Sequence, residues 1–194
     1  MLVQKYAVSY GSRNPQSVKV PEGAEVTGLK NSVKDADMVF LAVPSARIKQ
    51  TLDAIGKDEL RDKVIVDTTN VLTKTDDWAF EFFTIVEPIE PGTSEAEEIA
   101  KQLQSTKVVK AFNTVFSQQM NTGMIKGERL TLFIAGDDNE SKKKVETIGK
   151  AIGFETVDVG NLKMARYLEA MGMLIINLGY GKKMGPTAGF KLVK

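Results

Sequence analysis

The stretch that decides the fold is DMVFLAV, residues 37–43. After Asp37, every residue of this run is apolar. A strand with one solvent-exposed face alternates apolar and polar residues. An unbroken apolar run instead indicates a strand that is buried on both faces, as in a parallel sheet. The run VIV at 64–66, directly before Asp67, has the same character. These two runs predict strands that are buried on both faces of a parallel sheet.

The rest of the chain alternates strand-like and helix-like segments. Further strand-like runs lie at 6–10, 84–86, 107–112, 130–135 and 155–159, and amphipathic helical segments lie at 45–55, 94–103, 139–152 and from about 161. Ser94 followed by Glu97 has the spacing of a capping box, Asn139 is a plausible N-cap, and Gly153 suits a helix end. This alternation predicts an α/β doubly wound, Rossmann-like fold with a parallel sheet.

The amino-acid composition limits the reactions and the ligands that this protein could have. Of the 194 residues, 42% are apolar and 26% are charged, and the net charge is +1, so the chain carries no basic field for nucleic acid. No apolar run reaches the ~18 residues of a membrane span, so we expect a cytoplasmic protein that binds no membrane. The chain has no Cys and no His, which excludes thiolate nucleophiles, Cys- or His-ligated metals and His-dependent proton transfer. Hydride transfer between bound cofactors fits this composition, because the cofactors carry the reaction.

Small or polar residues follow four of the predicted strands. They are Gly11–Pro15, Pro44–Ser45, Thr68–Asn70 and Asn113–Thr114. Ligands of open parallel sheets lie beyond the carboxyl ends of the strands, so these four ends could line one crevice. Each also has a purely structural interpretation, as a surface turn, a strand stop, a cap or a backbone partner. We interpret Asp67 as structural.

Arg13 is the most informative of these residues. Its guanidinium suits a phosphate, with the Ser12 hydroxyl beside it. An acidic residue at such a strand end would instead take the ribose hydroxyls of NAD, so Arg13 favours NADP.

Several motifs together resemble a known family. YGSRNP, DMVFLAVP, VIVDTTN, VVKAFNT and RYLEAMG occur in that order, and KAFNT at 110–114 is the most specific. The set resembles the NADP-dependent reductases of the deazaflavin coenzyme F420 and their relatives, among them the dinucleotide-binding domains of ferric reductases. The resemblance runs from about Ala7 to Lys194.

The resemblance implies NADP at the strand ends and a C-terminal part that closes over the nicotinamide. By match, Ser12, Arg13 and Asn14 would hold the 2′-phosphate end, Ala42, Val43 and Pro44 would contact the nicotinamide half, and Asn70 and Asn113 would lie near the ring. We expect a dinucleotide-binding domain at 1–118 and the closing part at 119–194.

One part of the family pattern has no counterpart. The family begins with a strand, a G-x-G-x-x-G loop and a helix, and this sequence starts after all three. That strand is central in the usual order 3-2-1-4-5-6, and the loop holds the pyrophosphate. We therefore expect a Rossmann-like sheet without a normal first strand, weak binding of NADP, and strand edges that favour a dimer.

Two functions follow from these observations. The first is an oxidoreductase that transfers hydride between NADP(H) and a deazaflavin (coenzyme F420) or flavin-like acceptor. The second is a truncated Rossmann relative that binds dinucleotide weakly or not at all and acts as a non-catalytic subunit or interaction protein.

Overall fold

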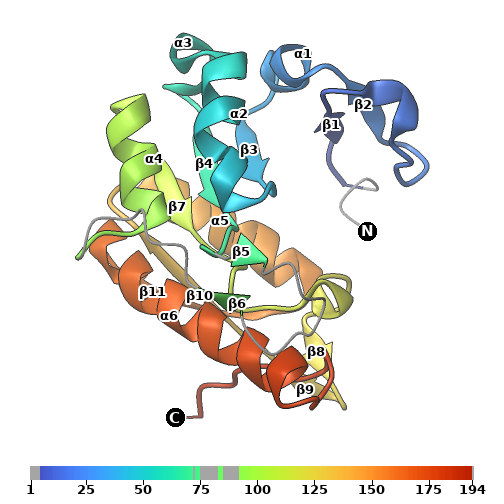
Figure 1. The fold of residues 1–194 in the computed structure, drawn as a ribbon, viewed down its shortest axis with the longest axis vertical. Coiled ribbons are helices and arrows are strands. Elements are labelled where there is room, and N and C mark those ends of the chain that lie inside the picture. The colour runs from blue at the N-terminus through green and yellow to red at the C-terminus, as the bar shows by residue number, and fades with distance from the viewer. Residues whose placement is uncertain (1–4, 72, 75–82, 85–91, 194) are drawn as a thin grey trace.

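The computed structural model describes residues 5–71, 73–74, 83–84 and 92–193. Its centre is a five-stranded sheet with the order β11-β10-β7-β4-β3 (Figure 1). The strands are β3 (Met38–Leu41), β4 (Val64–Asp67), β7 (Val108–Lys110), β10 (Thr131–Gly136) and β11 (Glu155–Gly160). β3, β4 and β7 are parallel, whereas β10 runs antiparallel to β7 and pairs in parallel with β11. The predicted α/β fold with a mostly parallel sheet is confirmed.

Helices cover both faces of this sheet. One face packs against α1 (Leu29–Val33), α2 (Ile48–Ile55), α3 (Lys57–Leu60) and α4 (Glu95–Leu103), and the other against α5 (Asn139–Ile152). Ile65 belongs to the first core and Val64 and Val66 to the second, so the apolar run of β4 is buried on both sides. This double burial explains the unbroken apolar run of β4. The expectation is wrong for β3, which is the edge strand of the sheet and exposes 40% of Phe40.

A second, separate sheet lies at the N-terminal end. It consists of β1 (Ser9–Gly11) and β2 (Glu25–Thr27), which pair in parallel with each other. Figure 1 shows it beside the helix α1 and apart from β4 and β7. Among the described residues β1 pairs only with β2, and β3 pairs only with β4, so the expected break in the sheet is present between β1 and β3.

The last part of the chain returns to the sheet. The helix α6 (Ala165–Ile176) follows a 3-10 turn at Leu162–Met164 and continues into one π-helical turn at Asn177–Gly181. Short antiparallel pairs are formed by β5 (Thr73–Lys74) with β6 (Phe83–Thr84) and by β8 (Met124–Ile125) with β9 (Glu128–Arg129). The expected domain boundary at 118/119 falls between β7 and β8, and β10 and β11 beyond it belong to the same sheet. The division of the chain into two domains at this point stays a prediction.

Three local expectations need correction or restriction. The N-cap of α5 is Asp138 rather than Asn139, because the Asp138 carboxylate accepts from Ser141 N at 2.7 Å. The first strand occupies Ser9–Gly11 and not residues 6–10. Of the expected strand at 84–86, residues 85 and 86 lie outside the described residues. The capping box at Ser94 and the helix end at Gly153 are confirmed.

Candidate active site

Two asparagines meet at the ends of neighbouring parallel strands. Asn70 follows β4 and Asn113 follows β7, and we call them the amide pair. Asn70 Nδ2 donates to the Asn113 carbonyl at 2.8 Å, and Asn113 Nδ2 donates to Asn70 Oδ1 at 3.0 Å. Asn113 is only 4% exposed, while Asn70 keeps partial access to solvent. The pair therefore forms a fixed polar group at the carboxyl end of the parallel strands, where ligands of such sheets bind.

The helix α6 closes tightly over this pair. Asn113 Nδ2 also donates to the Leu168 carbonyl at 2.7 Å. A Cβ atom added at Gly172 would overlap Asn70 Oδ1 and Asn113 Nδ2, so only glycine permits this approach. Both amide protons of Asn113 are then used, whereas its buried Oδ1 has no partner within the described part of the chain. Asn113 Oδ1 and the Oγ1 of Thr69, the residue before Asn70, are thus both buried acceptors without a hydrogen-bond partner among the described residues.

The backbone at the end of β7 is strained. Phe112 has φ of +66°, a left-handed conformation that a bulky side chain rarely adopts. Its ring is buried and packs against Phe40 (5.9 Å between ring centroids) and Phe154 (6.0 Å). This packing holds the sharp turn that leads into Asn113.

A buried ammonium lies beneath the amide pair. Lys110 is fully buried, and its Nζ lies 2.8 Å from Asp67 Oδ2, 2.7 Å from the Thr69 carbonyl and 2.9 Å from Glu169 Oε1. Burial lowers the pKa of Lys110, but the two carboxylates outweigh burial and raise the pKa above its usual value. Lys110 is therefore charged, with two hydrogen-bond acceptors and an ion pair to Glu169 around its ammonium.

Glu95 adds a third carboxyl to this group. Its backbone N–H, in the first turn of α4, donates to Glu169 Oε2 at 3.3 Å. Burial, followed by the charges of Asp67 and Glu169, raises the pKa of Glu95 to about 7. Burial likewise raises the pKa of Glu169. Lys110, Asp67, Glu169 and Glu95, which we call the lysine cluster, thus hold three carboxyls against one ammonium, and the surplus negative charge favours a proton on Glu95 near neutral pH.

The residues predicted for the 2′-phosphate lie at the end of β1. Ser12 Oγ accepts from Asn14 N at 3.1 Å, and Ser12 N donates to the Thr27 carbonyl at 2.9 Å. Arg13 is exposed and has no hydrogen bond or ion pair with any described residue. Its guanidinium is accessible to an anion, but no hydrogen bond or ion pair of the described residues joins this turn to the amide pair.

The end of β3 lies next to the end of β4. The Leu41 carbonyl accepts from the Thr68 hydroxyl at 3.0 Å, which places Ala42 and Val43 beside the turn that carries Asn70. Ala42 and Pro44 are exposed, whereas Val43 packs against the core. The structure thus brings residues 42–44 near the turn 68–70 and leaves residues 12–14 in the turn after β1, a strand of the separate sheet.

The sequence reasoning did not find the lysine cluster. Lys110 appeared only as a letter of the KAFNT motif, and Asp67 was interpreted as structural, in agreement with its buried pairing. A usable signal was present, because Asp67 and Lys110 are opposite charges in two otherwise apolar strands. The two residues are register partners in the β4–β7 ladder.

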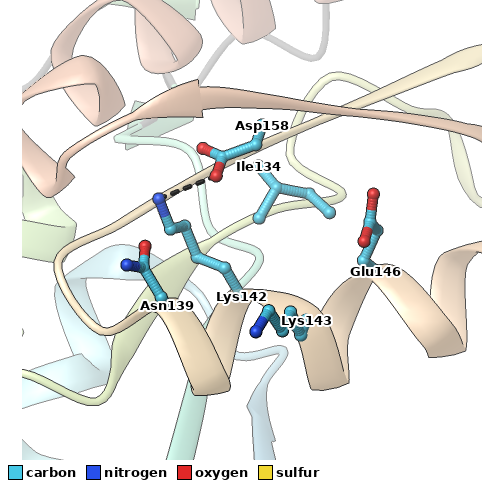
Figure 2. A pocket seen from close by; sticks show the side chains of 6 residues that line it. All are labelled: Ile134, Asn139, Lys142, Lys143, Glu146 and Asp158. Carbon is cyan, nitrogen blue, oxygen red and sulfur yellow. Dashed lines mark ion pairs between the residues drawn. The ribbon is translucent and has the colours of Figure 1, made fainter.

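A separate shallow pocket of about 150 Å³ lies at the start of α5. Figure 2 shows Lys142 reaching across it to Asp158, and their charged atoms are 2.8 Å apart. This pairing already neutralises the ammonium. None of the predicted site residues lines this pocket.

The described residues hold neither a metal cluster nor a membrane-spanning helix. They contain no cluster of three or more acidic side chains arranged for a metal ion. Within the same residues, no helix has both the length and the apolar character to cross a bilayer.

Comparison with known proteins shows which families this chain is similar to. Residues 2–71 match the family described as "NADP oxidoreductase coenzyme F420-dependent". This part of the chain is similar to the members of that family. The resemblance predicted from the motifs is confirmed.

Two curated relatives extend the match along the chain. "Metalloreductase STEAP3" of Rattus norvegicus is 30% identical over 173 residues, which are 88% of this chain and 32% of that protein. "F420-dependent NADP reductase" of Methanocaldococcus jannaschii is 29% identical over 168 residues, covering 84% of this chain and 72% of the relative. The chain thus spans about a third of the length of the rat metalloreductase.

Solved structures confirm the fold. A candidate F420-dependent NADP reductase from Arthrobacter sp. FB24 has a TM-score of 0.86 at 24% identity, over 98% of this chain and 90% of its own. Pyrroline carboxylate reductase of Plasmodium falciparum, solved with NADP bound, has a TM-score of 0.51 at 11% identity, over 88% of this chain and 54% of its own. Both likenesses establish the Rossmann-like fold.

Proposed function

We propose that this protein is an oxidoreductase that transfers hydride between NADP(H) and a deazaflavin (coenzyme F420) or a flavin-like acceptor. The observation that carries the proposal is the amide pair, held by α6 at the ends of β4 and β7 with the Oδ1 of Asn113 unpaired. The names of the relatives support the same reaction class. The absence of Cys and His is compatible with it, because the cofactors supply the hydride chemistry.

The residues present fit the two ends of NADP. The buried Asn113 Oδ1 matches the N–H of a nicotinamide carboxamide, and the unpaired guanidinium of Arg13 matches the 2′-phosphate. The Ser12 hydroxyl already accepts from Asn14 N and can still donate to a phosphate oxygen. In this assignment the amide pair orients the ring, α6 excludes water, and Arg13 selects NADP over NAD.

A calorimetric titration tests this assignment. We expect wild-type protein to bind NADPH more tightly than NADH, and Arg13→Ala to weaken NADPH binding about 10- to 100-fold, since a bond to a charged group contributes about 1.5–3 kcal/mol. The affinity for NADH should not change in this variant. Arg129→Ala is the matched control, because Arg129 is an exposed arginine of β9. Equal loss for both dinucleotides would contradict the role of Arg13.

A non-catalytic function is the second candidate, and a specific observation favours it. Ser12, Arg13 and Asn14 follow β1, whose sheet is separate from the strands that carry the amide pair. In addition, the pattern G-x-G-x-x-G, whose backbone N–H groups would hold a pyrophosphate, does not occur in the 194 residues. A folded protein that binds neither dinucleotide at millimolar concentration would support this second function over the first.

We also propose that the chain self-associates, most simply as a dimer. β1 and β3 each have one edge without a strand partner among the described residues, and such edges pair with other chains. Tyr167 and Leu174 on α6 are 64% and 49% exposed and add apolar surface. Light scattering behind a sizing column should give twice the chain mass of 21.3 kDa. A monomer at high concentration would contradict this proposal.

A further inference from the structure

The lysine cluster connects the strand ends to the helix that closes the site. Lys110 extends from β7, the Thr69 carbonyl belongs to the turn after β4, and Glu169 belongs to α6. The ammonium contacts an acceptor from each of the last two elements and the Asp67 carboxylate as well. One buried side chain therefore fixes the relative positions of three segments.

Lys110 contacts Thr69 and Glu169, and each of these is adjacent in sequence to a residue that takes part in the hydrogen bonds of the amide pair. Thr69 immediately precedes Asn70, and Glu169 immediately follows Leu168, whose carbonyl accepts from Asn113 Nδ2. We propose that Lys110 is a positioning residue for the amide pair, acting through the Thr69 carbonyl and the Glu169 carboxylate. The consequence for cofactor binding rests on the proposed function, in which the amide pair faces the nicotinamide.

Other contacts of α6 do not serve the same purpose. Arg166 forms two hydrogen bonds with Glu97, at 2.7 and 2.8 Å, and these hold α6 against α4. An apolar side chain at position 110 could fill the same volume, but it could not bind the turn after β4 and α6 at once. The positional role therefore depends on the ammonium and not on packing alone.

The test uses a variant that leaves no buried charge unpaired. Lys110→Met alone would strand Asp67 and Glu169 in the interior, and breaking a buried pair in this way is strongly destabilising. The triple variant Lys110→Met/Asp67→Asn/Glu169→Gln removes all three charges together. Glu169→Ala is a milder second variant that removes the link from Lys110 to α6, together with the hydrogen bond from Glu95 N, and leaves Lys110 with two acceptors.

The first readout is the NMR signal of the Asn113 side-chain amide, which requires no cofactor. We expect its protons to shift and to exchange with solvent at least 10-fold faster in the triple variant, and to change in the same direction, by less, in Glu169→Ala. Lys142→Met is the matched control, because Lys142 is also a largely buried lysine paired with an aspartate, away from the site. Unchanged Asn113 signals in a folded variant, either the triple variant or Glu169→Ala, would overturn the proposal.

The second readout distinguishes an effect on binding of the nicotinamide end of the cofactor from an effect on binding of the adenosine end. The triple variant should bind NADPH about 10-fold more weakly, while its affinity for adenosine 2′,5′-bisphosphate, which lacks the nicotinamide, should stay unchanged. Equal weakening for both ligands would mean that Lys110 acts on the whole fold and would overturn the positioning role. If wild-type protein binds no NADPH, the proposed function fails, whereas the NMR measurement still decides whether Lys110 positions Asn113.

Discussion

β7 and β1 are both strands of three residues, yet every residue of β7 is buried and every residue of β1 is exposed. β7 has a strand on each side, β4 and β10, and helices on both faces of its sheet. β1 has one strand partner, β2, and the short helix α1. The difference teaches that the neighbours of a short strand determine how firmly it is held. A strand cannot form hydrogen bonds to its own backbone groups or bury its own apolar side chains, so adjacent strands and helices must do both.

Amide hydrogen exchange should show the largest difference between the two sheets. Ile65 N donates to the Lys107 carbonyl at 2.9 Å in the large sheet, and Ser12 N donates to the Thr27 carbonyl at the same distance beside β1. Ile65 N should open only with global unfolding, at about 5 kcal/mol or more, whereas Ser12 N should open at about 2 kcal/mol or less. Equal protection would show that the small sheet is as firmly held as the large one.

Removing the same atoms from each sheet sharpens the comparison. Val66 in β4 is fully buried and Val26 in β2 is only half-buried. We expect Val66→Ala to lower the free energy of unfolding by about 2–3 kcal/mol and Val26→Ala by less than about 1 kcal/mol. Chemical denaturation measures both, and similar losses would contradict the comparison.

The pH dependence of stability should report the lysine cluster. Glu95 has a pKa of about 7 in the folded protein against 4.5 for the ordinary group, so folding favours its protonated form. Its contribution to stability is present below about pH 4.5 and is lost as the pH rises through about 7. Glu95→Gln should therefore gain stability relative to wild type over this range, by about 2 kcal/mol at pH 8, less than the full shift implies because the side chain is partly exposed.

The control for this measurement is Glu140→Gln, which changes an exposed carboxylate in the first turn of α5. Its stability difference from wild type should not vary with pH in the same window. A Glu95→Gln variant that tracks wild type from pH 4 to pH 8 would mean that the cluster holds no such proton.

The smallest effects should come from two arginines. Arg166 pairs with Glu97 across α6 and α4, whereas Arg13 has no partner among the described residues. Arg166→Ala should lower the melting temperature slightly, and Arg13→Ala should leave it unchanged. A loss of thermal stability on removal of Arg13 would show that its turn is part of the structural core.

Much of the large sheet could be predicted from the sequence. The apolar runs at 38–43 and 64–66 became β3 and β4, because an apolar run of this length is typical of a strand in a parallel sheet. Burial on both faces holds for β4 but not for β3, which is the edge strand. The sequence did not predict β2 or α1. These elements, Glu25–Thr27 and Leu29–Val33, are short and contain few apolar residues in a regular pattern. Their structure depends on contacts with each other and with β1, which no local pattern records.

The sequence by itself determined the α/β fold, the polar strand ends with Asn70 and Asn113, and a composition that fits cofactor-borne chemistry. The tertiary structure alone decided that these asparagines pair, that Lys110 joins Asp67 and Glu169, and that the turn with Arg13 follows a strand of a separate sheet. The physical reason is distance along the chain. Asp67 and Lys110 are 43 residues apart, so their contact follows from strand register and not from any neighbouring residue.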